Sequence, residues 1–288
     1  MKALQLVILA VTAAPFFVNA SSSDSAHHKQ ITNQVMEDQR NFLLVQTKNK
    51  GFGPQAPRDI DLKTGSNDRD FSLSPPSAEM NLCNIHFHKN AEHKGGEFTK
   101  YAGNGDGHGY QTGYQYSGHL SHAELADFGK KVGETKHGAI YPGDTLEVHY
   151  VYSTAQVEPG ATLGACLSES IKNPQLRVET QVYVAVNDKE AKNFVSLTKV
   201  ETVDGLYQAV NIPGNTGVPV EYAGSTTGPG YNEKGSPFQV TWSVRPNVEK
   251  VSIGTIDQWL QGNVFDEDHA HGVRNLVTNP TLLSNIAH

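Results

Sequence analysis

The amino-acid sequence predicts a β-dominated α+β fold, a single domain built on a large, twisted, mostly antiparallel central sheet. Strand-like runs rich in β-branched and aromatic residues recur through the second half of the chain, separated by Gly, Pro, Asn and Asp. No internal repeat is visible. With 288 residues, 37% of them hydrophobic, the chain can bury one sizeable core. These three observations favour one large β-rich domain over several small ones.

The first twenty residues are typical of a secretory signal peptide. Lys2 precedes an apolar run, Leu6 to Phe17, and the small residue Ala20 stands before the polar Ser21. The run is too short to span a bilayer comfortably, and no later apolar run approaches that length. We therefore expect residues 1–20 to be a signal peptide and the product to be exported, either periplasmic or secreted.

The elements are expected in the following order. A polar N-terminal arm, residues 21–50, could hold a helix over Gln30 to Val45, and the folded domain should occupy 51–288. After a first strand, the Gly-, Tyr- and His-rich stretch 94–142 reads as a long excursion of loops with one short helix, Ser121 to Lys131; loops this long are usually functional. The pattern then predicts strands at Thr145 to Tyr152, Arg177 to Val186, Phe194 to Val203, Leu206 to Ile212, Val218 to Tyr222, Phe238 to Val244 and Glu249 to Ile253, and a closing helix at Thr255 to Gln261.

Charge and cysteine content narrow the function. The formal net charge is −7 and Lys and Arg are dispersed, which argues against nucleic acid as a partner. The sequence contains two cysteines, Cys83 and Cys166. Because an exported chain meets an oxidising compartment, we expect them to form a disulfide, with buried free thiols as the alternative. The sequence leaves the oligomeric state open.

The segment 81–93, NLCNIHFHKNAEH, is the richest in potential metal ligands. If Leu82 to His88 is a strand, alternation places His86 and His88 on one face and Cys83, Ile85 and Phe87 on the other. A catalytic zinc site takes three protein ligands, so two imidazoles need a third. The alternative is a pair of histidines on a solvated strand face.

The strand Thr145 to Tyr152 supplies the candidate third ligand. Glu147, His149 and Val151 share one face by alternation. If this strand pairs with the first, His149 completes a three-histidine site. Glu147 can then accept a hydrogen bond from the outer nitrogen of a ligand imidazole, which fixes its tautomer and orientation. Val151 would offer an apolar wall beside the metal.

These residues resemble a known family. The segment NIHFHKNAEH, residues 84–93, looks like the signature of the delta-class carbonic anhydrases, and the wider layout is similar to the alpha class. The alpha-like segments are QAPRDI (55–60), EVH (147–149), YAGSTT (222–227) and QVTW (239–242). The resemblance covers roughly residues 51–262 and implies an alpha-carbonic-anhydrase-like fold with a catalytic domain over 51–288.

The resemblance also implies a mechanism and site residues. His86, His88 and His149 would bind Zn²⁺, which Co²⁺ or Cd²⁺ could replace, and the reaction would be reversible hydration of CO2 to bicarbonate and a proton. Thr226 would orient the attacking hydroxide and pass a hydrogen bond to Glu92, while Thr227 would help to bind substrate. Val151, Val240 and Trp242 would line an apolar CO2 pocket.

Two features depart from the alpha pattern. Residues 51–80 contain no histidine that could serve as the usual proton shuttle, so the candidates lie in the excursion: His108, which we favour, and His119, His122 and His137. The spacing between the second and third ligands is longer than in the alpha class, so the excursion is expected to cover or rim the site. A further pair, His269 and His271, follows an acidic turn-like stretch and is interpreted as at most an incidental surface metal site.

Two other functions remain open. A cupin-type metalloprotein would use His86, His88, Glu92 and His149 as ligands, with iron or manganese as the metal. A non-catalytic anhydrase-like binding domain is the second alternative, although such relatives typically lose a ligand histidine and all three candidates are present.

Overall fold

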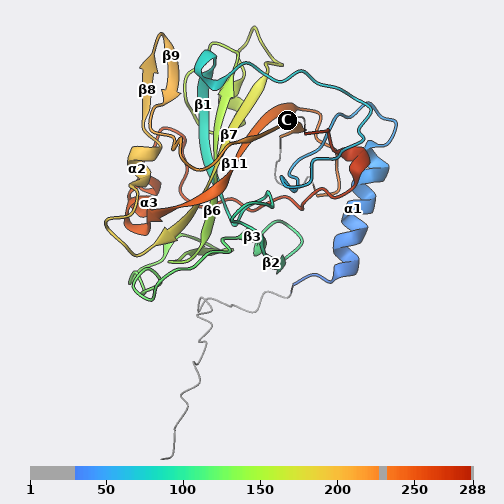
Figure 1. Ribbon diagram of the computed structural model, residues 1–288. Coiled ribbons are helices and arrows are strands. Elements are labelled where there is room, and N and C mark those ends of the chain that lie inside the picture. The colour runs from blue at the N-terminus through green and yellow to red at the C-terminus, as the bar shows by residue number, and fades with distance from the viewer. Residues whose placement is uncertain (1–29, 227–231, 287–288) are drawn as a thin grey trace, which may run out of the picture.

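A five-stranded sheet is the centre of the fold, in a computed structural model that describes residues 30–226 and 232–286 (Figure 1). Neighbouring strands run antiparallel except β7 and β11, which are parallel. In spatial order the strands are β1 (Asn81–Lys89), β6 (Thr145–Ser153), β7 (Leu176–Val186), β11 (Gln239–Ser252) and β10 (Val220–Ser225). The prediction of a β-dominated domain with a large, mostly antiparallel sheet is confirmed.

Smaller elements surround this sheet. Three two-stranded ribbons are formed by β2 (Lys100–Asn104) with β3 (Thr112–Gln115), β4 (Val132–Thr135) with β5 (Gly138–Ile140), and β8 (Val200–Val203) with β9 (Leu206–Ala209). The α-helices are α1 (Asn33–Thr47), α2 (Phe194–Leu197) and α3 (Ile253–Leu260); the 3-10 helices are η1 (Ser77–Glu79), η2 (Leu163–Cys166) and η3 (Pro280–Leu282). Figure 1 shows α2 and α3 together at one side of the sheet and α1 at the opposite side of the molecule.

The two main apolar clusters of the core lie on opposite faces of the sheet, and a smaller third one joins α1 to the C-terminal segment through Leu43, Val277, Leu282 and Leu283. Strand β6 is buried along its whole length and serves both main clusters. Leu146, Val148 and Tyr150 belong to the first cluster and Val151 to the second, where Trp242 also lies. Burying a large apolar side chain contributes about 1.5–3 kcal/mol, and a one-residue slip would exchange the two faces. The register of β6 is therefore strongly specified, and so is the face on which Glu147 and His149 lie.

Two predicted elements are wrong. The predicted helix Ser121 to Lys131 is a single turn, closed by a hydrogen bond from the Leu125 amide to the Ser121 carbonyl. The carbonyls of Glu124, Ala126 and Asp127 do not continue the helix because they accept hydrogen bonds from the backbone and side chain of Asn187.

The predicted strand Phe194 to Val203 begins instead as helix α2. Asn193 caps this helix, since its side chain accepts a hydrogen bond from the Ser196 amide. Strand β8 starts only at Val200.

The remaining elements are found with shifted ends. The helix expected over Gln30 to Val45 is α1, and the closing helix is α3. The two strands predicted at Phe238 to Val244 and Glu249 to Ile253 are one long strand, β11, whose register with β7 shifts between Val244 and Val248. Pro246 lies in this irregular stretch and has no N–H with which to continue the ladder.

The expected disulfide between Cys83 and Cys166 is present and joins β1 to η2. The predicted face of Cys83 is wrong, however. The register of β1 shifts between Leu82, opposite Tyr152, and Asn84, opposite Val151, so Cys83 is the extra residue of a bulge. Cys83 consequently packs in the same cluster as Val151, while Ile85 and Phe87 lie in the other.

The segment interpreted as a signal peptide, residues 1–20, lies outside the described residues.

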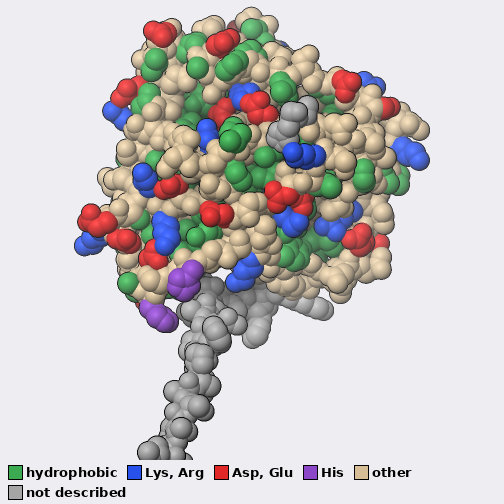
Figure 2. All heavy atoms as spheres, viewed as in Figure 1, with side chains coloured by type: hydrophobic (Ala, Val, Ile, Leu, Met, Phe, Trp, Pro, Cys, Tyr) green, Lys and Arg blue, Asp and Glu red, His purple; other side chains and the backbone are tan. Residues whose placement is uncertain are grey.

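Figure 2 shows Lys and Arg interspersed with Asp and Glu over the visible face. Within residues 30–226 and 232–286, no helix combines the length and apolar character needed to cross a membrane.

Removing the disulfide should destabilise the fold. The two cysteines are 83 positions apart, and cross-linking a long loop restricts the unfolded chain. We expect a Cys83→Ser/Cys166→Ser variant to lose about 2–5 kcal/mol of unfolding free energy, measured by urea denaturation. Wild type kept in reducing buffer is the control and should behave like the variant. An unchanged urea midpoint in both would contradict this expectation.

Candidate metal centre

Three histidines meet on one face of the sheet, as the sequence predicted. Strands β1 and β6 pair antiparallel with His149 directly opposite His86, and His88 opposite Glu147. One ring nitrogen from each of His86, His88 and His149 lies within 4.8 Å of those of the other two. His88 and His149 are buried. This spacing suits three ligands around one ion.

The outer ring nitrogens all have hydrogen-bond acceptors. The Nδ1 atom of His86 lies 2.6 Å from Asn84 Oδ1, and that of His88 lies 2.7 Å from the Gly272 carbonyl oxygen. The Nε2 atom of His149 lies 2.7 Å from Glu147 Oε1. These nitrogens therefore carry the ring hydrogens, and the lone pairs belong to Nε2 of His86 and His88 and to Nδ1 of His149.

The inward nitrogens fit a metal ion. The Nε2 atom of His88 is buried and has no hydrogen-bond partner among the described residues. The lone-pair nitrogens of His86 and His149 face each other at 3.2 Å, an unfavourable contact unless a cation or a proton lies between them. Three imidazoles that each direct a lone pair to one point are a donor set that zinc accepts.

Burial keeps two of these imidazoles neutral. It lowers the pKa of His86 well below its ordinary value and lowers that of His88 to about 4, and the charges of neighbouring histidines act in the same direction. Metal ligation requires the neutral form of histidine. The site is thus ready to bind a cation at neutral pH without first releasing protons from these two rings.

Glu147 links the ligands to a buried hydrogen-bond chain. Its Oε1 accepts from His149 and, at 2.8 Å, from Nδ1 of His93, and its Oε2 accepts from the His93 amide at 3.0 Å. The Nε2 of His93 lies 2.6 Å from the Tyr222 hydroxyl, which donates to it. The sequence prediction that Glu147 orients a ligand imidazole agrees with this geometry, and His93 links Glu147 to Tyr222.

The ionisation states of this chain follow from its surroundings. Burial raises the pKa of Glu147, but the charges and hydrogen bonds of His93 and His149 outweigh burial and hold that pKa well below its usual range. Burial raises the pKa of Tyr222 well above its ordinary value, so its hydroxyl stays a donor. An ionised carboxylate at this position holds the His149 ring in the tautomer that a metal needs.

Glu92 lies behind the ligand rings. It is buried, and its Oε1 accepts a hydrogen bond from the Arg274 amide at 2.8 Å. Its oxygens approach Nδ1 of His88 at 3.9 Å and Nε2 of His149 at 4.0 Å, the nitrogens that point away from the common centre. Glu92, Glu147 and His149 form a second close group, but the His149 nitrogen on that side already donates to Glu147. This position disfavours the cupin interpretation, in which Glu92 is a ligand.

The predicted partner of Glu92 has a different contact. The Thr226 hydroxyl lies 3.0 Å from Ser236 Oγ, and within the described residues Thr226 makes no hydrogen bond to Glu92. Thr226 nevertheless lines a hollow beside His86 and His149. Thr227 lies outside the described residues. The hydroxide-orienting role of Thr226 therefore stays a prediction.

An apolar hollow adjoins two of the ligands. The three predicted wall residues, Val151, Val240 and Trp242, line it together with His86 and His149. The sequence analysis missed three other apolar members, Leu163, Leu176 and Val178. Val178 could have been predicted from the pairing of the two strands, because Val178 on β7 is directly opposite Val151 on β6.

A larger cavity of about 440 Å³ also adjoins the site, and we call it the polar cavity because most of its lining residues have polar or charged side chains. Its wall includes His86, His88 and Glu92, and also His108 and Tyr110 from the excursion. His108 is exposed, so it lies where the cavity meets solvent. The expectation that the excursion rims the site agrees with this arrangement.

His271 lies closer to the three histidines than the sequence indicated. Its backbone pairs with β1, donating to the Phe87 carbonyl and accepting from the Lys89 amide, and its ring centroid lies 5.7 Å from that of His86. Burial lowers the pKa of His271, but Glu267, whose Oε2 is 2.6 Å from Nε2, raises it above the ordinary value. The sequence carried no signal for a pairing between segments this far apart.

The other histidines lie outside the cavity. His269 pairs with Asp268 at 2.5 Å. His119 and His122 are exposed, and His137 stacks on Tyr110 with ring centroids 3.6 Å apart. Among the excursion histidines of the described structure, His108 is therefore the one that lines the polar cavity.

Comparisons with known proteins place this site in a family. A family model described as delta carbonic anhydrase matches residues 77–255, which include all three histidines. A comparison with curated proteins gave no significant match.

Similar solved structures include three carbonic anhydrases. The alpha-carbonic anhydrase of Thermovibrio ammonificans, in complex with the inhibitor sulfanilamide, is 17% identical, with 77% of this chain and 84% of that chain covered and a TM-score of 0.27. A hyperthermostable carbonic anhydrase from an active hydrothermal vent chimney is 14% identical, with 82% and 88% covered and a TM-score of 0.31. The Photobacterium profundum alpha-carbonic anhydrase is 17% identical, with 79% and 88% covered and a TM-score of 0.27. These superpositions are poor, so the family assignment rests on the sequence match.

The buried neutral rings predict that the metal-free protein is acid-sensitive. The pKa of His88 falls from 6.5 to about 4 on folding, so between these pH values the unfolded chain binds a proton that the folded chain does not. Stability should be full above pH 6.5 and should fall as the pH drops towards 4, by about 1.4 kcal/mol per pH unit for this group.

The measurement is urea unfolding of chelator-treated protein across this range. A His88→Gln variant removes one titrating ring and should show a shallower pH dependence, whereas His122→Gln, at an exposed position, should match wild type. Equal slopes for wild type and His88→Gln would show that His88 is not the group responsible.

Proposed function

This chain belongs to the delta carbonic anhydrase family, whose reaction is the reversible hydration of CO2, and we propose that it performs this reaction with zinc bound by His86, His88 and His149. One observation carries the assignment of the ligands. The three inward nitrogens lie within 4.8 Å of one another while each outer nitrogen is held by its own acceptor. An incidental group of surface histidines would have no reason to be oriented in this way.

Zinc is the proposed metal because all three donors are neutral imidazole nitrogens in a closed, oriented set. Cobalt or cadmium could occupy the same donors. In carbonic anhydrases, bound zinc lowers the pKa of a coordinated water to about 7 and so supplies a nucleophile at neutral pH.

The side chains of this protein position the reactants. The apolar side chains of Val151, Val240 and Trp242 lie beside His86 and His149, and we propose that linear, uncharged CO2 packs against this surface. We propose that Thr226, which lines the same hollow, orients the attacking oxygen, and that Glu92, buried behind the rings, anchors that orientation. Bicarbonate is charged, so it should leave through the polar cavity.

A proton must also reach solvent in every cycle of hydration. We propose that His108 accepts it, because this side chain is exposed and lines the polar cavity together with two of the ligands. An imidazole can both accept a proton from the site and release it to buffer.

We also propose that the protein is exported. The N-terminal pattern of a signal peptide supports this location, and so does the disulfide, since such bonds persist in oxidising compartments.

The metal assignment is tested by replacing the third ligand. Wild type purified without added metal should contain about one zinc per chain, since one set of three ligands is present. His149→Ala should lose most of the zinc and lower CO2 hydration in stopped flow at least about 100-fold. Glu147→Gln, which keeps the ligand but weakens its orientation, should lower zinc affinity about 10–100-fold.

Three results would count against the proposal. The first is a wild type that hydrates CO2 no faster than His149→Ala does. The second is a purified protein that contains iron in place of zinc, and the third is a carboxylate detected among the metal ligands by X-ray absorption spectroscopy. The last two would favour a cupin-type site.

The proton-transfer role of His108 gives a separate expectation. In weak buffer, His108→Ala should lower kcat for CO2 hydration roughly tenfold or more, while kcat/KM should change little because proton release follows the chemical step. Added imidazole should restore kcat. His122→Ala, at an exposed position outside the cavity, is the matched control. If kcat is equal in the two variants, His108 is not the shuttle.

A further inference from the structure

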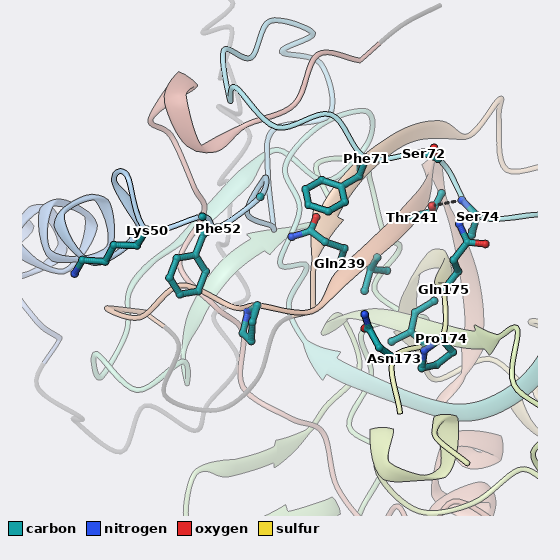
Figure 3. A pocket seen from close by; sticks show the side chains of 16 residues that line it. Lys50, Phe52, Phe71, Ser72, Ser74, Asn173, Pro174, Gln175, Gln239 and Thr241 are labelled. Atoms are coloured by element: carbon teal, nitrogen blue, oxygen red, sulfur yellow. Dashed lines mark hydrogen bonds between the residues drawn. The ribbon is translucent and has the colours of Figure 1, made fainter. Parts of the chain in front are cut away.

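A second cavity, of about 420 Å³, lies where the parallel strands β7 and β11 begin (Figure 3). It shares no lining residue with the polar cavity of the metal site, and it adjoins the apolar hollow, with which it shares Leu176 and Val240. Its volume falls in the range of about 300–1,000 Å³ that is typical of small-molecule sites. Carbonic anhydrase activity assigns no role to this cavity.

Buried polar atoms of the wall lack partners. Ser74 is only 8% exposed, and its hydroxyl oxygen has no hydrogen-bond partner in the described structure. The backbone amide of Ser74 is fixed by Thr241 Oγ1 at 2.7 Å, the contact drawn in Figure 3. The Oε1 atom of Gln239 is also buried without a partner. Because an unpaired buried polar atom is costly, both atoms favour a ligand that can donate or accept hydrogen bonds.

More uncharged polar groups stand at the rim. The side-chain amides of Asn173 and Gln175 are exposed, line the cavity, and form no hydrogen bond with another described residue. Each offers two donors and one acceptor. Together with Ser74 and Gln239, they can pair with groups that are themselves both donors and acceptors, which is the property of hydroxyls.

Two phenyl rings complete the wall. Phe52 and Phe71 both line the cavity, and Phe71 remains 38% exposed. Phe71 and Gln239 close over Gly53, where an added Cβ would lie 2.2 Å from the Phe71 ring and 2.6 Å from the Gln239 amide nitrogen. The glycine thus lets an aromatic face and an amide stand side by side.

The charges on the wall restrict the ligand further. Among the described residues that line the cavity, the exposed Lys50 alone is charged. No carboxylate is available for a cation, and one exposed lysine is a weak site for a phosphate. A purely apolar ligand would leave Ser74 and Gln239 unpaired.

We propose that this cavity binds a pyranose ring of a saccharide. The C–H face of the sugar packs on Phe71, and its hydroxyls pair with Ser74 and with the amides of Gln239 and Gln175. The sugar-binding groups Phe71, Ser74, Gln175 and Gln239 do not line either space beside the three histidines, so saccharide binding would anchor the enzyme without occupying its active site.

Saturation-transfer difference NMR with the purified zinc-loaded protein tests this proposal. The probes are methyl β-D-glucopyranoside, methyl α-D-mannopyranoside, sodium glucuronate and, as a non-sugar comparison, adenosine. We expect transfer to the ring protons of at least one sugar. A Phe71→Ala variant should weaken binding roughly tenfold, because the exposed ring carries the apolar contact. Leu73→Ala is the matched control, since Leu73 is 47% exposed on the same segment and does not line the cavity.

Each possible outcome either supports the saccharide site or overturns it. Sugar transfer that is lost in Phe71→Ala and kept in Leu73→Ala supports the site, whichever of the three sugars gives it. The proposal is overturned if no sugar shows transfer, if Phe71→Ala binds as wild type does, or if adenosine alone binds. CO2 hydration should be unchanged in both variants. Loss of that activity in wild type would defeat the metal proposal and leave this test unaffected.

Discussion

The buried carboxylate of Glu147 is the constraint on which the site depends. A carboxylate inside a sheet is tolerated only when its oxygens are paired, and removing one partner of a buried charge typically costs about 3–5 kcal/mol. Here the partners are His149 and His93, and His93 in turn binds Tyr222. Strands β6 and β10 are thereby joined, through the segment that follows β1, by polar contacts in a region that is otherwise apolar. The same contacts orient His149, a candidate metal ligand. The contacts that stabilise the fold therefore also set the geometry of the metal site.

Local patterns in the sequence were sufficient to predict on which face of the sheet a side chain lies wherever side chains alternate regularly. Period-two alternation in residues 145–152 placed Glu147, His149 and Val151 on one face, and the structure has them there. Alternation failed at Cys83, because a bulge inserts one residue and nothing local in the sequence announces it. The helix predicted from Ser121 failed for a different reason, since Asn187 takes the carbonyls that would have continued it. The place of His271 depends on backbone pairing with β1, which a single sequence does not reveal.

The proposed metal would lie beside two unlike spaces. One is the hollow of Val151, Val240 and Trp242, and the other is the cavity that contains His108 and Glu267. Leu163 borders both, and its short helix η2 is joined to β1 by the disulfide. An uncharged gas and a charged product therefore meet different surfaces at one centre. This separation follows from β6, whose alternate side chains supply a ligand and an apolar wall two residues apart.

The hydrogen bond from His88 to the Gly272 carbonyl has a consequence for how the protein is made. A ribosome adds residues in order, and the ring of His88 lacks its acceptor until residue 272 has been added. Glu92 likewise waits for the amide of Arg274. A nascent chain that already contains the three histidines still lacks the Gly272 carbonyl and the Arg274 amide, which fix His88 and Glu92. The oriented set of three histidines therefore needs residues 272 and 274 as well as the two strands that carry the rings.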